Sequence, residues 1–279
     1  MTKVASATRT TQAVILARGL GTRMRRGNDD ALNGDQANAA ASGAKGMMPF
    51  ARPFFDYVLS TLADAGITDA ILVIGPPPGD AAIRDYFAST KTERRVSVRF
   101  AVQAEPRGTA DAVLAARGVV RPAPFLMLNS DNYYPLEACN ALAAIGGAGL
   151  VAFEADTLVR ESGIEEGRVL RYALVDADPT GFLRAIHEKP DADHPLAKAR
   201  QRWVSMNLWS FTPTIFDACE RVAPSARGEL EVQDAVTIAI RDFGERFRVL
   251  PMNGAVLDLS SRADVAFVGQ RLASITPRP

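Results

Sequence analysis

The stretch AVILARGLGTRM, at residues 13–24, decides the fold class of this chain. Its first four residues are apolar, as in a strand that is buried in a sheet. Gly19 and Gly21 follow almost at once, and residues without a side chain allow the backbone to approach a ligand closely. In an open α/β sheet, the turn after the first strand is a common phosphate-binding position. The sequence therefore predicts an α/β protein that opens with a phosphate-binding turn.

Beyond this turn, short apolar runs alternate with amphipathic stretches of helical length, a pattern typical of β-α-β units. After Gly167 the pattern changes, and the turn-rich sequence ADPTG at residues 177–181 predicts an antiparallel hairpin. We expect a Rossmann-like, doubly wound mixed sheet with a smaller antiparallel element. Strands are expected at 13–16, 70–74, 96–102, 125–129, 150–153, 169–176, 182–188, 204–211 and 247–250. Helices are expected at 53–65, 80–88, 109–117, 135–144, 213–222 and 230–241, and after Ser261, a suitable N-cap.

The length of 279 residues fits one large α/β domain, which we place at residues 12–270. Residues 1–11 are polar and are predicted to form a disordered tail. Residues 27–44 are rich in Asn, Asp, Gly and Ala and offer little to bury, so they are predicted to form a flexible loop.

The charge balance excludes several classes of partner. Lys and Arg number 32 and Asp and Glu also number 32, so the formal net charge is zero. Such a chain lacks the basic surface that binds nucleic acid or an anionic membrane, and its phosphate binding must be local. Cys139 and Cys219 have no metal-type spacing, and no signal peptide or membrane span is visible. We expect a cytoplasmic protein with small-molecule partners, and the sequence leaves a homo-oligomer open.

Two familiar phosphate-binding motifs do not match the sequence around the glycine-rich turn. A dinucleotide fingerprint needs a third glycine where Met24 stands, and no Gly-Lys-Ser/Thr follows to complete a P-loop. A nicotinamide-dependent dehydrogenase is therefore disfavoured. What remains is a glycine-rich turn that ends in Arg23, followed by Lys45 shortly before a new helix. These two cations are expected to flank one anion site.

Further motifs follow in order: QAEPRGTA at 103–110, NSDN at 129–132, EKP at 188–190, SARGELE at 225–231 and VLD at 256–258. With residues 13–24, they resemble the sugar nucleotidyltransferase family, also called nucleoside-diphosphate-sugar pyrophosphorylases, and particularly its thymidylyl and uridylyl branches. The resemblance implies the nucleotide-diphospho-sugar transferase fold. Residues 12–155 would then serve mainly the nucleotide, and residues 156–260 mainly the sugar phosphate.

The resemblance implies an enzyme that converts a nucleoside triphosphate and a sugar 1-phosphate into a nucleotide sugar and pyrophosphate, with Mg²⁺ as cofactor. Gln103 favours UTP or dTTP, because an amide can both donate to and accept from a pyrimidine, although related adenylyl enzymes carry similar loops. The catalytic residues would be Arg23, Lys45 and Lys189. The nucleotide would contact Leu16, Ala17, Gly19, Gly21, Thr22, Gln103, Gly108 and Thr109. The sugar phosphate would contact Asn132, Glu188, Lys189 and Arg227. The metal ligands would be Asp131 and Asp258, which both follow apolar strands.

Each assignment has a structural alternative. The cations could be solvated surface groups, Asp131 a turn former, and Glu188 with Lys189 an ion pair at a strand end. The chain also departs from the family pattern at Arg18, Gly46, Ala173 and Asn207. The first three of these departures motivate a second hypothesis, a non-catalytic sensor or regulatory subunit of the same fold that binds nucleotide sugars.

Overall fold

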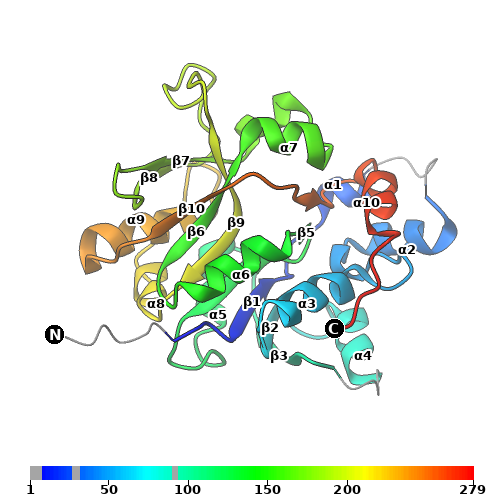
Figure 1. Cartoon of the computed structure of the whole chain (residues 1–279). Helices are drawn as coiled ribbons and strands as arrows, with labels where there is room; N and C mark the ends of the chain where they lie inside the picture. The colour runs from blue at the N-terminus through cyan, green and yellow to red at the C-terminus, as the bar shows by residue number, and fades with distance from the viewer. Residues whose placement is uncertain (1–7, 27–31, 90–93) are drawn as a thin grey trace.

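The computed structural model describes residues 8–26, 32–89 and 94–279, and within them it has one large mixed sheet. The strand order is β10-β6-β9-β4-β1-β2-β3, with β7 joined to β8 and β9 (Figure 1). The strands are β1 (Gln12–Leu16), β2 (Asp69–Ile74), β3 (Ser97–Val102), β4 (Phe125–Asn129), β5 (Asn132–Tyr133), β6 (Gly149–Glu154), β7 (Ala173–Ala177), β8 (Leu183–His187), β9 (Trp203–Phe211), β10 (Arg248–Met252) and β11 (Leu257–Asp258). The predicted fold class is confirmed.

Helices surround this sheet, and several are short. The α-helices are α1 (Thr22–Arg25), α2 (Gly34–Ser42), α3 (Phe54–Asp64), α4 (Ala81–Ser89), α5 (Thr109–Ala115), α6 (Leu136–Ala144), α7 (Ala155–Ser162), α8 (Thr214–Cys219), α9 (Val232–Phe243) and α10 (Asp264–Leu272). Two 3₁₀ segments are η1 (Lys45–Met47) and η2 (Glu166–Arg171). Among the described residues, no helix combines the length and apolar character needed to cross a membrane.

The part of the sheet that carries the site is parallel. β1 pairs in parallel with β2 and β4, and β2 pairs in parallel with β3, so the carboxyl ends of these strands meet at one edge. β9 runs antiparallel between β4 and β6, which makes the whole sheet mixed. The predicted hairpin is β7–β8, with Leu174 opposite His187.

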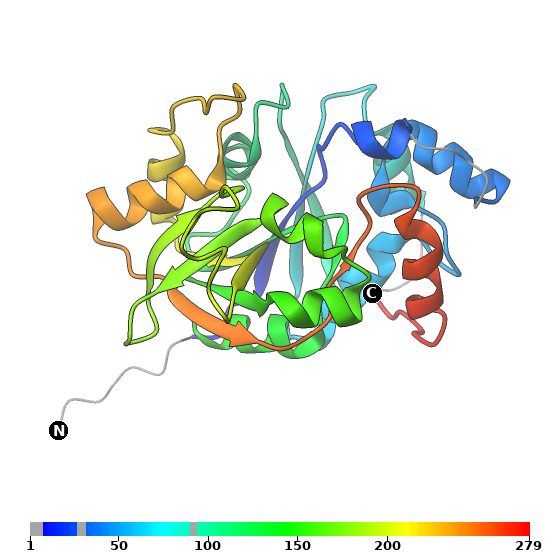
Figure 2. The same ribbon diagram turned by 90° about the horizontal axis from the view of Figure 1, so that it is seen from above.

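Hydrophobic clusters cover both faces of the sheet. Val14 and Ile15 are neighbours in β1, yet they belong to different clusters because successive strand residues point to opposite faces. The cluster with Ile15 includes α3, α6 and α10, and the cluster with Val14 includes α5, α8 and α9. Figures 1 and 2 show α10, at the end of the chain, beside α1 near its beginning. A hydrogen bond of 2.6 Å from Arg262 Nε to the carbonyl of Met24 links the two regions.

The loop predicted at 27–44 is wrong for its second half, because Gly34–Ser42 form helix α2. Asn33 caps this helix: its side chain accepts from the backbone of Gln36, whose side chain accepts in return from the backbone of Asn33. Such a capping box and an alanine-rich segment both favour a helix. Residues 27–31 lie outside the described residues.

The disordered tail predicted at 1–11 is wrong for its last residues. Thr10 is buried, and its amide donates to the carbonyl of Ala143 at 2.9 Å. The carbonyl of Thr11 accepts from the amide of Thr68, also at 2.9 Å. These backbone hydrogen bonds hold the segment that leads into β1 in place. The sequence did not indicate this, because the segment is polar and has few apolar side chains. Residues 1–7 lie outside the described residues.

Other boundaries also differ from the prediction. The strand expected from Val169 begins only at Ala173, because η2 occupies the residues before it. Helix α7 was not predicted; its cap is Glu154, whose carboxylate accepts from the amide of Thr157 at 2.7 Å. The N-cap of α10 is Ala263 rather than Ser261, whose amide and hydroxyl lie 2.6 and 2.9 Å from Asp264 Oδ2.

Candidate active site

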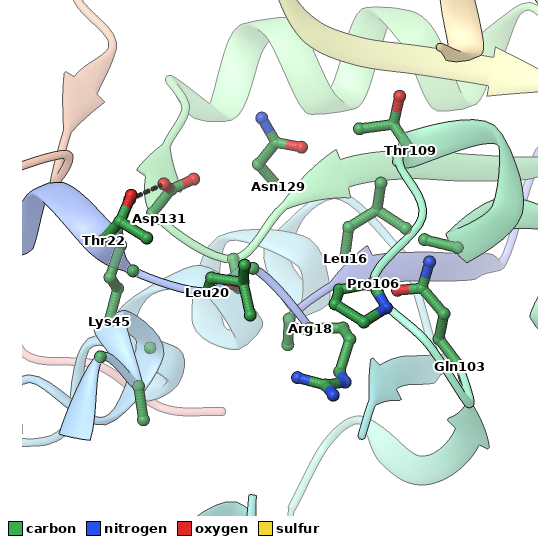
Figure 3. A pocket seen from close by; sticks show the side chains of 18 of the residues that line it. Leu16, Arg18, Leu20, Thr22, Lys45, Gln103, Pro106, Thr109, Asn129 and Asp131 are labelled. Carbon is green, nitrogen blue, oxygen red and sulfur yellow. Dashed lines mark hydrogen bonds and ion pairs between the residues drawn. The ribbon is translucent and has the colours of Figure 1, made fainter. Parts of the chain in front are cut away.

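A pocket of about 500 Å³ opens where β1, β3 and β4 end (Figure 3). Segments from distant parts of the sequence form its wall. They are residues 16–23 after β1, residues 43–46 at η1, residues 103–109 after β3 and residues 129–131 after β4. The pocket therefore lies at the edge of the parallel sheet where ligands of open α/β folds bind.

Two glycines allow the backbone of the pocket wall to pack closely. Gly21 has a φ of 60°, and a Cβ there would lie 2.6 Å from the carbonyl oxygen of Gly43. Gly108 has a φ of 127°, and a Cβ there would lie 2.5 Å from the backbone nitrogen of Leu230. Both positions need glycine for conformation and for space. The first brings residues 19–23 against residues 43–46, and the second holds the loop after β3 in place.

The pocket brings together most of the predicted nucleotide site. Its lining includes both predicted triphosphate cations, the predicted metal ligand Asp131 and every residue assigned to the nucleotide, which are Leu16, Ala17, Gly19, Gly21, Thr22, Gln103, Gly108 and Thr109. Lys45 Nζ lies 2.7 Å from Asp131 Oδ2, and their side chains are 14% and 21% exposed. Arg23 forms no ion pair within the described part of the chain.

Gln103 is a buried member of this lining, and its hydrogen bonds limit what it can offer a base. The amide nitrogen donates to the carbonyl of Gly108 at 3.1 Å and to Asp111 Oδ2 at 2.8 Å. Both amide hydrogens are then in use, whereas the side-chain oxygen can still accept a hydrogen bond. The sequence predicts that Gln103 both donates to and accepts from the base, whereas this arrangement leaves it only the accepting role.

Asp258 is buried and is not among the residues that line the pocket. It belongs to β11, where it pairs with Asn132 of the antiparallel β5, and this pairing brings it close to the end of β4. Burial raises the pKa of Asp258, and the negative charge of the nearby Asp131 raises it further. The two predicted metal ligands are thus electrostatic neighbours.

Hydrogen-bond donors occupy both oxygens of Asp258. Arg168 Nη2 lies 2.9 Å from Oδ2, and the hydroxyl of Tyr172 donates to the same oxygen at 2.8 Å. The Ser260 hydroxyl lies 2.7 Å from Oδ1 and 2.8 Å from Oδ2, and the Asn132 amide donates to Oδ1 at 3.2 Å. Neither Arg168 nor Tyr172 was assigned a role from the sequence, since no motif marks them.

The two predicted metal ligands differ in how well they fit Mg²⁺, which takes oxygen ligands. Lys45 engages only one oxygen of Asp131, so Oδ1 is available. The oxygens of Asp258 are both engaged, and this carboxylate could ligate a metal only after donors such as Arg168 moved away. Among the described residues there is no group of three or more His, Cys, Asp and Glu side chains arranged to hold a metal.

Three of the four predicted sugar-phosphate residues form a separate cluster outside the pocket lining. Glu188 Oε1 lies 3.6 Å from Lys189 Nζ and 3.7 Å from Arg227 Nη2. Arg227 also pairs with Glu231 at 2.6 Å. Burial raises the pKa of Glu188 despite these cations. Asn132, the remaining member of the predicted set, is buried against Asp258.

The departures noted in the sequence also have structural positions. Asn207 has a φ of 58°, as expected of an asparagine that replaces glycine at a left-handed position. Gly46 is buried beneath Phe55, where a Cβ would lie 2.3 Å from the ring. Arg18 lines the pocket, although the sequence assigned it no function. Glu229 also lines the pocket and was not assigned individually.

Fold and pocket together define an α/β protein with a nucleotide-sized site at the edge of its parallel strands. A family model described as nucleotidyl transferase matches residues 38–252, and the chain belongs to this family. Enzymes of this kind generally use a divalent metal ion.

Curated relatives and solved structures agree with this assignment. The chain is 27% identical over 266 residues to the UTP–glucose-1-phosphate uridylyltransferase AglF of Haloferax volcanii, covering 95% of this chain and 98% of that protein. It is 28% identical over 284 residues to a glucose-1-phosphate thymidylyltransferase of Streptomyces antibioticus, covering 96% and 68%. Other curated relatives are longer, and the chain spans 57% of one and 52% of another. The structure of UDP-glucose pyrophosphorylase complexed with UDP-glucose matches with a TM-score of 0.73 at 16% identity, covering 96% of this chain and 100% of that one, which shows a shared fold.

Proposed function

We propose that the protein is a sugar-1-phosphate nucleotidyltransferase that converts UTP or dTTP and a sugar 1-phosphate into a nucleotide sugar and pyrophosphate. The observation that carries this proposal is the pocket itself. One cavity gathers the glycine-rich turn, the cationic side chains of Arg23 and Lys45, a carboxylate and the loop around Gln103. Similarity to a uridylyltransferase and a thymidylyltransferase supports the choice of pyrimidine nucleotides.

The proposed reaction needs no nucleophilic side chain. The phosphate of a sugar 1-phosphate is largely a dianion near neutral pH, since the second pKa of such esters is about 6. One of its oxygens attacks the α-phosphorus, a new P–O bond forms, and the bond to the β-phosphate breaks with its electrons leaving on pyrophosphate. Arg23 and Lys45 would stabilise the charge that builds on the departing pyrophosphate. Gln103 would accept a hydrogen bond from the ring N–H of uracil or thymine.

Mg²⁺ belongs to the proposal as the cofactor, held first by Asp131. When bound, it would neutralise phosphate charge and align the reacting groups. Asp258 would join as a second ligand only with a rearrangement of Arg168 and Tyr172. For the sugar phosphate, the proposal keeps Lys189 and Arg227, whose positive charges lie in the cluster with Glu188.

Pyrophosphate release tests the proposal across a grid of UTP, dTTP, ATP, CTP and GTP against a panel of sugar 1-phosphates with Mg²⁺. We expect turnover with a pyrimidine triphosphate, and its loss in Asp131→Asn. Asp85→Asn, at an exposed position on α4, is the matched control and should keep full activity. Turnover that persists unchanged in Asp131→Asn would remove that residue from the mechanism, and a blank grid would reject the reaction.

A specific observation keeps the sensor hypothesis as a second candidate. The carboxylate of Asp258 is held by Arg168 instead of being open to a metal, which suits binding without turnover. Such a protein would bind UDP-glucose or dTDP-glucose in equilibrium dialysis and release no pyrophosphate with any pair of the grid. Turnover with any pair would rule it out.

A further inference from the structure

Arg18 adds a positive charge to the pocket wall, and the proposed reaction assigns it no role. It precedes Gly19 at the start of the glycine-rich turn, and it lines the cavity. Figure 3 shows its side chain on the side of the cavity away from Asn129 and Asp131. The sheet order explains this position, because β4 and β2 flank β1 on opposite sides. Arg18 extends towards the end of β2, so Asp131 does not neutralise it.

The place where Arg18 lies depends on the absence of a side chain at Gly75. A Cβ at Gly75, directly after β2, would lie 2.6 Å from Arg18 Nε and 2.9 Å from Cζ. Gly75 is not among the glycines with a left-handed φ, so its backbone conformation does not require glycine. The missing Cβ instead provides the space that the guanidinium group fills.

The charge of Arg18 is uncompensated within the described part of the chain. Its Nε atom is buried and has no hydrogen-bond partner, and Arg18 forms no ion pair with a carboxylate there. Lys45, in contrast, is neutralised by Asp131 at 2.7 Å. A buried donor on a charged group that lacks a partner is costly, and an anionic ligand would remove that cost.

We propose that Arg18 binds the triphosphate chain of the nucleotide, as a third cation beside Arg23 and Lys45. This inference rests on the proposed function only in taking a nucleoside triphosphate as the ligand. The phosphate chain is favoured over the base because Arg18 belongs to the glycine-rich turn and carries a full charge, whereas a pyrimidine is neutral. A planar guanidinium group can also donate two parallel hydrogen bonds to phosphate oxygens.

Calorimetric binding without added metal or sugar phosphate tests this assignment, with inorganic tripolyphosphate, UTP and uridine as probes. For Arg18→Ala, we expect roughly 10- to 100-fold weaker binding of tripolyphosphate and UTP, the loss of a hydrogen bond to a charged group. Uridine binding should change by less than about twofold, since no phosphate is present. Arg18→Lys should lie between the two proteins. Arg271→Ala, at an exposed position on α10, removes the same charge from the surface and should bind like the unaltered protein.

Gly75→Ala is a second variant that leaves the charge of the protein unchanged. Its new Cβ should displace Arg18 and weaken tripolyphosphate binding, and it should have no further effect when Arg18 is already alanine. Unchanged tripolyphosphate binding in Arg18→Ala, or an equal loss for uridine, would overturn the assignment. Because these measurements need no turnover, a blank pyrophosphate grid with a clear Arg18 effect rejects only the reaction. Turnover without an Arg18 effect rejects only the role of Arg18.

Discussion

The ion pair between Arg168 and Asp258 should be a major contributor to stability, because it is almost fully removed from solvent. The two side chains are 15% and 5% exposed, and Arg168 also lies 3.1 Å from Asp264. Removing one partner of a buried pair costs about 3–5 kcal/mol, because the other charge is left buried without compensation. Asp258 retains donors from Tyr172 and Ser260, so we expect Arg168→Met to cost about 3 kcal/mol, at the lower end of that range.

Urea denaturation measures this loss, and Arg202→Met provides a matched control. Arg202 is 17% exposed, similar to Arg168, but its partner Asp156 is 55% exposed. Removing Arg202 should therefore cost at most about 1 kcal/mol. A double-mutant cycle of Arg168→Met with Asp258→Asn should give a coupling energy of about 2 kcal/mol. A loss in Arg168→Met no larger than that in Arg202→Met, or a coupling energy near zero, would refute the reasoning.

Three further predictions concern the pocket and the loop after β8. Lys45→Met should lower kcat by roughly 10²- to 10³-fold in the pyrophosphate assay, since it removes a cation from the departing charge. Gly108→Ala should lower the free energy of unfolding by about 1–3 kcal/mol in urea, because of its left-handed φ and its contact with Leu230. Burial, followed by the charge of His194, lowers the pKa of His187 below its usual 6.5. NMR titration should therefore find a pKa of His187 below 6.5 that rises in His194→Gln. Because the folded state lowers this pKa, His187 contributes to the free energy of unfolding above pH 6.5, and the contribution is lost as the pH falls through the folded-state pKa.

The nucleotide half of the site could be predicted because its residues are close in sequence to the strands that position them. Arg23 and Asp131 each follow a strand of the parallel sheet within a few residues, and parallel strands end at one edge. Lys45 is further away in sequence, and its position depends on η1 and on the close approach of Gly21 to Gly43. Its place beside the glycine-rich turn was expected from the sequence, and its ion pair with Asp131 was not.

The sequence was less informative where partners come from distant segments. Nothing in the neighbourhood of Arg168 indicates that it pairs with Asp258, since the contact joins η2 to β11 across the fold. The error at α2 has a different cause. The low burial expected of its alanines suggested a loop, whereas two local features, the cap of Asn33 and the helix propensity of alanine, stabilise a helix.

Whether Asp258 stays paired with Arg168 when Mg²⁺ is present distinguishes two ways in which the site could hold the metal. If the protein turns over substrate, Asp131 would hold the metal either alone or together with Asp258, and the second arrangement would require Asp258 to separate from Arg168. The second possibility breaks a buried pair, whose cost must be offset by metal coordination. Arg168→Met would then remove that cost in advance, and Mg²⁺ should stabilise the variant more than the unaltered protein. If Asp131 holds the metal without Asp258, Mg²⁺ should stabilise both proteins equally. The pair of Asp258 and Arg168 is then a structural support of the site.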